Sequence, residues 1–238
     1  MTEYQIKEEA KKLESADAES VLRWGMETFP KMALACSFGA EDVVVVDLLS
    51  KVDPGHRVTV FTLDTGRLHE ETYEIMERIR EKYQVSIVSY FPEREAVEEL
   101  ERGKGFYSFR KSVENRKECC GIRKVEPLKR ALAGQDAWVT GLRREQAATR
   151  TAVPKVEADS AHGGMPKLNP LADWTTPQVW DYIRKHEVPY HKLHDSHFPS
   201  IGCSPCTRAV QPGEDIRAGR WWWEKAEQKE CGLHVKPR

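Results

Sequence analysis

The sequence lacks the features that would direct it to a membrane or a nucleic acid. No apolar run approaches the roughly 20 residues that span a bilayer, and the polar, acidic start MTEYQIKEEAKKLES does not resemble a signal peptide. The 37 basic and 38 acidic residues nearly cancel, leaving a formal net charge of −1. This balance argues against a general nucleic-acid or membrane-surface binder, although it is compatible with a local basic pocket. We therefore expect a cytoplasmic protein with neither partner.

Internal repeats and low-complexity segments are also absent, and 238 residues suffice for one substantial core followed by a tail. Short apolar strands alternate with helical patterns, which predicts an α/β fold with a parallel sheet and right-handed crossovers. The predicted strands cover residues 32–37, 57–64, 85–90 and 136–141. The predicted helices cover 5–28, 43–52, 69–83, 93–102, 123–134 and 176–187, with a further short helix at the tryptophans 221–223.

Three loops follow predicted strands: SFGAED (37–42), LDTGR (63–67) and TGLRREQ (140–146). Ligands of open parallel sheets bind beyond the carboxyl ends of the strands. Each loop alone is compatible with a plain turn, since none carries the lysine of a phosphate-binding P-loop. Their convergence on one edge predicts a nucleotide pocket, with a phosphate at a helix N-terminus.

Four of the six cysteines form two pairs, Cys119–Cys120 in ECCGIRK and Cys203–Cys206 in IGCSPCTR. In a reducing compartment, paired cysteines bind metal or do chemistry more often than they form disulfides. A structural zinc site draws its thiolates from spaced pairs, and CxxC fits that pattern. Adjacent cysteines point apart, which suits the separate irons of a 4Fe–4S cluster better than one zinc ion. A cluster is favoured; zinc and unrelated buried thiols remain alternatives.

The motifs CCGIRKVEPLK, TGLRREQ, IGCSPCTR, GRWWWE and KECGLH, in this order, resemble the assimilatory sulfonucleotide reductases. The resemblance is closest to the iron–sulfur adenylyl-sulfate (APS) reductases and runs from about Ala35 to His234. It implies an adenine nucleotide α-hydrolase-like (modified PP-loop) α/β fold. It also implies reduction of APS to sulfite and AMP with electrons from thioredoxin or glutaredoxin. Residues 1–210 are then the nucleotide-binding domain with the cluster, and 211–238 a mobile C-terminal tail.

The resemblance also assigns roles to residues. The cluster ligands are Cys119, Cys120, Cys203 and Cys206, and the catalytic nucleophile is Cys231. A thiolate can attack the sulfur of APS and expel AMP, and a second thiol can then release sulfite from the S-sulfocysteine. Cys36 ends an apolar strand and is expected to be structural or part of the pocket wall. The expected substrate-binding residues are Ser37, Gly39, Asp42, Leu63, Lys124, Gly141, Arg150, Arg217, Arg220 and His234.

Several questions stay open at this point. Phe38 stands where iron–sulfur APS reductases often carry serine, and the order SFG is similar to reductases of 3′-phosphoadenylyl sulfate (PAPS). A PAPS or dual-specificity reductase is therefore an alternative. A zinc-stabilised nucleotide-binding module and an ATP-splitting PP-loop ligase are alternatives from other classes, although the ligase loop SGGxDS is absent. The tryptophans are expected to pack rather than to stack on a base. The sequence leaves the oligomeric state open, a homo-oligomer included.

Overall fold

The computed structural model describes residues 1–147 and 150–225, together with Lys229 and Leu233. Its centre is a six-stranded sheet in the order β3-β2-β1-β4-β6-β5. All neighbouring strands are parallel except β5 and β6. The strands are β1 (Met32–Ala35), β2 (Thr59–Leu63), β3 (Ile87–Tyr90), β4 (Ala137–Val139), β5 (Val156–Asp159) and β6 (Met165–Leu168). The predicted α/β class with a parallel sheet is confirmed.

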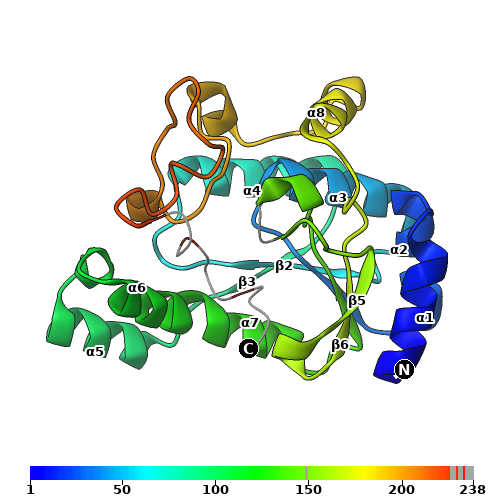
Figure 1. Cartoon of the computed structure of the whole chain (residues 1–238), viewed down its shortest axis with the longest axis horizontal. Coiled ribbons are helices and arrows are strands. Elements are labelled where there is room, and N and C mark those ends of the chain that lie inside the picture. Colours follow the sequence, from blue (N-terminus) through cyan, green and yellow to red (C-terminus); the bar gives the residue numbers. More distant parts are fainter. Residues whose placement is uncertain (148–149, 226–228, 230–232, 234–238) are drawn as a thin grey trace.

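Helices cover both faces of this sheet (Figure 1). One core contains the apolar side chains of α2, α3, α4 and α8. On the other face, Leu128, Ala131 and Leu132 of α7 pack against Phe61 and Trp138. The helices are α1 (Glu3–Leu13), α2 (Ala18–Thr28), α3 (Ala40–Val52), α4 (Glu70–Tyr83), α5 (Arg94–Lys104), α6 (Val113–Cys120), α7 (Glu126–Leu132) and α8 (Thr176–Lys185). Among the described residues, no helix is long and apolar enough to cross a membrane.

Local signals explain where several helices begin. Thr2 and Thr175 form capping boxes at α1 and α8, and Asp17 and Ser112 accept hydrogen bonds from the first turns of α2 and α6. These side chains satisfy backbone N–H groups that have no partner within the helix. Gly39, before α3, makes no such side-chain cap. The N-terminus of α3 therefore differs from those of α1, α2, α6 and α8, because no side chain at its N-cap position accepts a hydrogen bond from its first turn.

Two sequence predictions were wrong. No strand was predicted after residue 141, but the segment that follows contains the hairpin β5–β6. Its strands are short, and the charged Lys167 and imino acid Pro166 hide the strand pattern, although Lys167 is buried beside Glu157 at 3.2 Å. The tryptophans 221–223 were expected to be helical, but they form a turn. Trp221 has φ of 40°, in the left-handed region, which is incompatible with a continuing right-handed helix.

Candidate active site

A cavity of about 630 Å³ lies at the carboxyl ends of β1, β2 and β4. All three loops that the sequence analysis singled out contribute to its wall. Nine predicted substrate-binding residues line it: Ser37, Gly39, Asp42, Leu63, Lys124, Gly141, Arg150, Arg217 and Arg220. The tenth, His234, lies outside the described residues, as does the predicted nucleophile Cys231. The structure thus brings together residues that are up to 183 positions apart, from Ser37 to Arg220 (220 − 37).

The loop between β1 and α3 is organised by Asp42. Its Oδ2 accepts hydrogen bonds from the Ser37 backbone N–H at 2.6 Å and from the Ser37 hydroxyl at 2.7 Å. Burial raises the pKa of Asp42 to about 6, because the charged carboxylate loses water, although these hydrogen bonds oppose the shift. Phe38 is fully buried with φ of 60°, an uncommon conformation for a bulky side chain. Asp42 therefore acts first as a support for the loop, with its carboxyl group at the cavity wall.

The loop after β4 packs directly on this support. A Cβ atom at Gly141 would come within 2.9 Å of the Glu41 Cβ and 3.1 Å of the Asp42 backbone N, and it would also collide with the Asp42 carboxylate. Only glycine permits this approach. The neighbouring Arg143 is buried and donates to Glu41 at 2.9 Å and to the Trp174 carbonyl at 3.0 Å. Arg143 thus joins the β4 loop to α3 as a structural cation.

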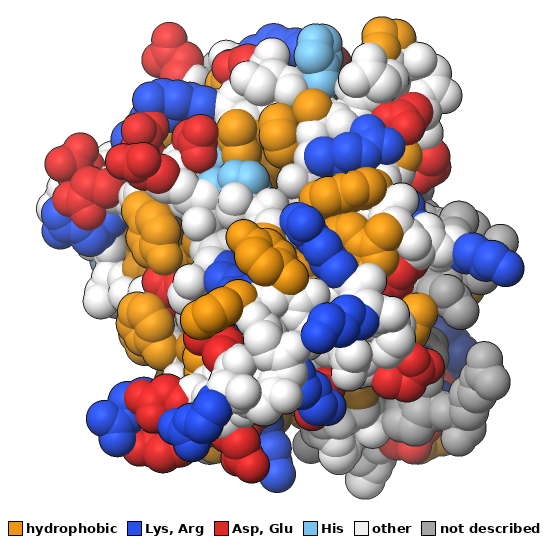
Figure 2. All heavy atoms as spheres, turned by 90° about the vertical axis from the view of Figure 1, so that its left-hand side faces the viewer, with side chains coloured by type: hydrophobic (Ala, Val, Ile, Leu, Met, Phe, Trp, Pro, Cys, Tyr) orange, Lys and Arg blue, Asp and Glu red, His pale blue; other side chains and the backbone are white. Residues whose placement is uncertain are grey.

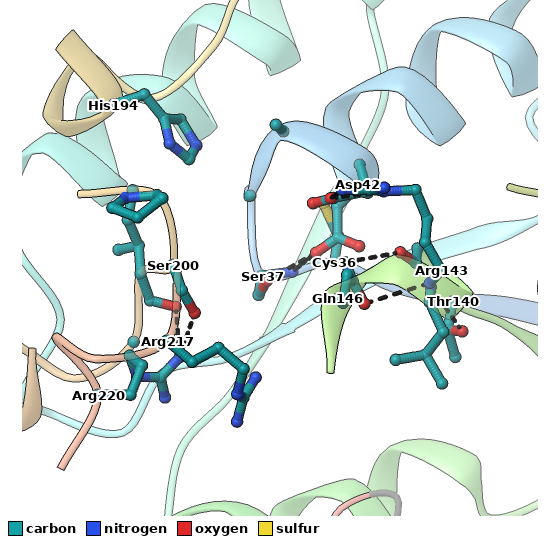
Figure 3. Close-up of a pocket in the computed structure, with 18 of the residues that line it drawn as sticks. Cys36, Ser37, Asp42, Thr140, Arg143, Gln146, His194, Ser200, Arg217 and Arg220 are labelled. Atoms are coloured by element: carbon teal, nitrogen blue, oxygen red, sulfur yellow. Dashed lines mark hydrogen bonds and ion pairs between the residues drawn. The ribbon is translucent and has the colours of Figure 1, made fainter. Parts of the chain in front are cut away.

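The opposite wall comes from residues 194–220 (Figure 3). Arg220 donates to the Ile201 carbonyl at 3.1 Å and to the Ser200 hydroxyl at 3.3 Å. Arg217 donates to the Lys229 carbonyl at 3.0 Å. Figure 3 shows both arginines, Ser200 and His194 across the cavity from the wall that contains Ser37 and Asp42. Two basic side chains on one wall suit a ligand with several negative oxygens.

Sequence reasoning missed several lining residues. Gln146 and Arg143 lie in the loop TGLRREQ, so the motif itself was the available signal. His194 and Ser200 belong to a segment without a recognisable spacing, and nothing in the sequence places them at this edge. Cys36 also lines the cavity, and burial followed by the charge of Asp42 raises the pKa of its thiol well above the usual value. A thiol with a raised pKa is a poor nucleophile, which agrees with a place in the wall.

A second, smaller cavity is lined by all four paired cysteines, Cys119, Cys120, Cys203 and Cys206. The first pair, Cys119 and Cys120, ends α6. It leads into a π-helical turn, Gly121–Val125. Such turns are rare in proteins overall, but those that occur are often found at functional sites. The second pair, Cys203 and Cys206, lies in the segment 201–206. The first pair therefore precedes α7 in the sequence and the second pair follows it.

The loop after β2 contacts the segment of the second cysteine pair and Arg123, which follows the first pair. Thr65 Oγ1 lies 3.3 Å from Cys203 Sγ, and the Ser204 N–H donates to the Arg67 carbonyl at 2.8 Å. Arg123 donates to the Thr65 carbonyl at 2.7 Å. Burial opposes ionisation of Cys203, but Lys124, the Thr65 hydroxyl, Arg220 and Arg123 together lower its pKa. By contrast, burial raises the pKa of Cys206 to about 12.

The two cavities share three lining residues, Lys124, Arg220 and Trp221. A cation in this shared wall faces the thiols on one side and the larger cavity on the other. Within the described parts of the chain, no group of three or more His, Cys, Asp or Glu side chains is arranged closely enough to hold a single metal ion. His191 is buried, and its Nε2 lies 3.0 Å from the Thr72 hydroxyl.

Fold and site together define an α/β protein with a basic cavity at the carboxyl edge of a parallel sheet and four thiols in an adjoining cavity. The chain belongs to the phosphoadenosine phosphosulfate reductase family, because residues 31–209 match the family's domain, described as "Phosphoadenosine phosphosulfate reductase domain". The adenosine 5′-phosphosulfate reductase of Allochromatium vinosum is 51% identical over 203 residues, which cover 85% of this chain and 78% of that protein. The enzyme of the same name from Burkholderia cepacia is 49% identical, over 95% of this chain and 88% of that protein.

Solved structures agree with this assignment. The phosphoadenylyl-sulfate (PAPS) reductase of Candida auris superposes with a TM-score of 0.74 and 31% identity, over 88% of this chain and 98% of that chain. The FMN adenylyltransferase of Candida glabrata superposes with a TM-score of 0.55 over 94% of this chain and 74% of that chain. At 14% identity, the second likeness shows the shared fold alone. The modified PP-loop fold expected from the sequence is thus confirmed.

Proposed function

We propose that this protein reduces APS to sulfite and AMP, with a thioredoxin-type dithiol as the reductant. The observation that carries the proposal is the shared wall of Lys124, Arg220 and Trp221 between a basic cavity and a four-thiol cavity. The names of the relatives at 49% and 51% identity support the same reaction. A cavity of about 630 Å³ is within the range usual for small-molecule ligands.

The four thiols fit a 4Fe–4S cluster. Cys119 and Cys206 are buried, Cys120 and Cys203 pack against the same apolar cluster, and cations surround them. Cys119, Cys120, Cys203 and Cys206 would hold the cluster, which when bound supplies a compact centre of negative charge beside Lys124 and Arg220. Thiolates from two segments around one cavity are the donor set that such a cluster requires.

The reaction needs cations to hold a sulfate–phosphate anhydride and a thiolate to attack it. Arg217, Arg220 and Lys124, with Arg150 from the β4 loop, would pair with the anionic oxygens. Cys231 Sγ then attacks the sulfur, the bond from sulfur to the bridging oxygen breaks, and AMP leaves with that oxygen. The product is an S-sulfocysteine at position 231. The pair Lys229 and Leu233, the described residues on either side of Cys231, supports this role, because both contact the cavity wall.

Release of sulfite completes the cycle. One thiolate of the reductant attacks Cys231 Sγ, and sulfite leaves with the electron pair of the broken sulfur–sulfur bond. The second thiol of the reductant resolves the mixed disulfide, which restores the Cys231 thiol and leaves the reductant as a disulfide. The dithiol thereby supplies both electrons. The proposal keeps residues 211–238 as the segment that presents Cys231, and 1–210 as the nucleotide-binding domain.

A mass measurement tests the two steps separately. Wild-type protein incubated with APS and no thioredoxin is expected to gain one SO₃ on the peptide that contains Cys231, and to lose it when reduced thioredoxin is added. Cys231→Ser is expected to bind nucleotide but to form no adduct and release no sulfite, because a serine hydroxyl is almost never ionised at neutral pH. Cys36→Ser serves as the control and is expected to form the adduct. Turnover by Cys231→Ser would overturn the mechanism.

PAPS is a second candidate substrate, because the Candida auris relative is named for it and Phe38 gives the order SFG. Sulfite release from APS and from PAPS, measured side by side, decides between them; faster turnover of APS is expected.

Iron and acid-labile sulfide analysis of anaerobically purified protein tests the cluster. Stoichiometric zinc without sulfide, and no sulfite from either nucleotide, would favour a zinc-stabilised binding module instead.

A further inference from the structure

A buried ion pair connects α6 to the segment that leads into the C-terminus. Arg116 Nε donates to Glu224 Oε1 at 2.9 Å, and Arg116 Nη2 donates to Glu224 Oε2 at 2.8 Å. The two side chains are only 1% and 3% exposed. A bidentate pair of this kind fixes direction as well as distance, because the planar guanidinium donates two N–H bonds that the two carboxylate oxygens accept in one orientation. Residues 116 and 224 are 108 positions apart in the sequence.

Arg116 also belongs to the wall of the thiol cavity. It lies three and four residues before Cys119 and Cys120 on α6, the spacing that puts side chains on one face of a helix. A guanidinium in the wall of the thiol cavity is thus paired with Glu224, which is seven residues before Cys231 in the sequence.

The backbone at Trp221 has an unfavourable conformation, which the Arg116–Glu224 pair helps to stabilise. Trp221 has φ of 40° and is 2% exposed, and its N–H donates to the Cys206 carbonyl at 3.1 Å. The guanidinium carbons of Arg116 and Arg220 lie 4.7 Å and 4.8 Å from the centre of its ring. A bulky residue persists in this conformation only where its surroundings determine it. Glu224 closes the turn, because its N–H donates to the Trp221 carbonyl at 2.8 Å.

We propose that Arg116 and Glu224 are a positioning pair that fixes the direction in which the chain leaves the thiol cavity toward Cys231. The proposal rests on the proposed function. The seven residues from Glu224 to Cys231 can span as much as about 25 Å when extended. A loose starting point would leave only the wall contacts of Lys229 and Leu233 to position the Cys231 thiol. A fixed starting point raises its effective concentration at the substrate sulfur. Loss of the carboxylate would leave a buried guanidinium without its main partner and release the turn.

The test compares Glu224→Gln with a matched control in the same segment. Glu214 forms a similar bidentate pair with Arg208, at 2.8 Å and 2.9 Å, but both side chains are about one-third exposed. Glu224→Gln is expected to slow SO₃ transfer to Cys231 in a single turnover by about tenfold or more while AMP affinity changes less than about threefold. It is also expected to speed tryptic cleavage after Lys225 and Lys229 by about tenfold or more. Glu214→Gln is expected to match wild type in all three measurements.

Three outcomes would overturn the proposal: an unchanged transfer rate and cleavage rate in Glu224→Gln, an equal loss of AMP affinity and transfer rate, or the same effects in Glu214→Gln. The double variant Arg116→Met with Glu224→Met removes both charges and serves if Glu224→Gln fails to fold. The double variant is expected to fold, to transfer SO₃ to Cys231 slowly and to be cleaved quickly by trypsin. Wild-type rates of SO₃ transfer and of cleavage in this variant would overturn the proposal, because apolar packing would then replace the ion pair. If wild type forms no adduct at all, the proposed function fails, and the tryptic comparison still decides whether the pair anchors this segment.

Discussion

Gly202 offers a sharp test of the basic wall, because its backbone lies against the guanidinium of Arg220. A Cβ atom at this position would come 2.5 Å from Arg220 Cζ and 3.0 Å from Arg220 Nε. Real Cβ atoms essentially never approach other heavy atoms this closely, so Gly202→Ala must displace the guanidinium. The displacement would also break its hydrogen bonds to the Ile201 carbonyl and the Ser200 hydroxyl. The backbone at Gly202 does not have a positive φ, so the effect comes from the guanidinium rather than from strain.

The magnitude follows from the contact that would be lost. A hydrogen bond to a charged group contributes roughly 1.5–3 kcal/mol, so AMP or APS should bind about 10- to 150-fold more weakly to Gly202→Ala. Calorimetric titration of the nucleotide measures this directly. Arg220→Ala is expected to weaken binding by a similar factor. Gly103→Ala is the control, since a Cβ there meets nothing within 4 Å, and it should bind like wild type.

A double-mutant cycle makes the reasoning refutable. Once Arg220 has been replaced by alanine, nothing remains for the added methyl group to displace, so Gly202→Ala should weaken binding little further in that background. A full additional loss in the double variant would show that the methyl group acts through the neighbouring Cys203 or the backbone. Wild-type affinity in Gly202→Ala itself would mean that the guanidinium moves without consequence and that Arg220 does not contact the ligand.

Two further predictions concern stability. Because burial raises the pKa of Asp42 to about 6 from its usual value near 4, the folded protein binds the extra proton more tightly than the unfolded chain. This contribution to stability is fully present below about pH 4 and is lost as the pH rises through about 6. The free energy of unfolding should therefore rise by about 1 kcal/mol from pH 7 to pH 5, relative to that of Asp42→Asn. Parallel pH curves in urea titrations of the two proteins would contradict this prediction. Tyr182→Phe removes the hydroxyl that donates to Asp47 at 2.6 Å and should cost about 1 kcal/mol of stability in the same titrations without changing nucleotide affinity. Lost affinity would instead show that this hydrogen bond positions the α8 residues that line the cavity.

The sequence was sufficient to predict the central sheet and the edge at which the cavity lies. Apolar strands such as residues 32–35 and 59–63 alternate with helices, and that alternation by itself places the following loops at one edge. The hairpin β5–β6 was not predictable in this way, since Lys167 reads as a surface residue but is buried 5.1 Å from the ring of Trp138. A pattern of apolar positions cannot report a buried cation that is stabilised by partners distant in sequence.

The candidate site shows the same limit. Lys124 and Arg220 were predicted from the motifs that contain them, and both line the cavity. Arg143, in an equally conspicuous motif, was not predicted to bind substrate; it also lines the cavity, but its guanidinium is held by Glu41 and the Trp174 carbonyl. The bond between Arg116 and Glu224 is invisible in the sequence, because each residue alone resembles an ordinary surface charge. Long-range charge pairs are set by the packing of elements and not by local spacing.

One loop explains why the two cavities adjoin. Leu63, at the end of β2, lines the larger cavity, whereas Thr65 and Arg67, two and four residues later, contact the segment that contains Cys203 and Ser204. An anion on one side and thiolates on the other would repel each other across so short a distance. Lys124 and Arg220 stand between them, and a cation that faces both sides reduces that repulsion. With the proposed substrate and cluster bound, the basic shared wall would therefore offset the repulsion between two negative groups that residues 63–67 bring close together.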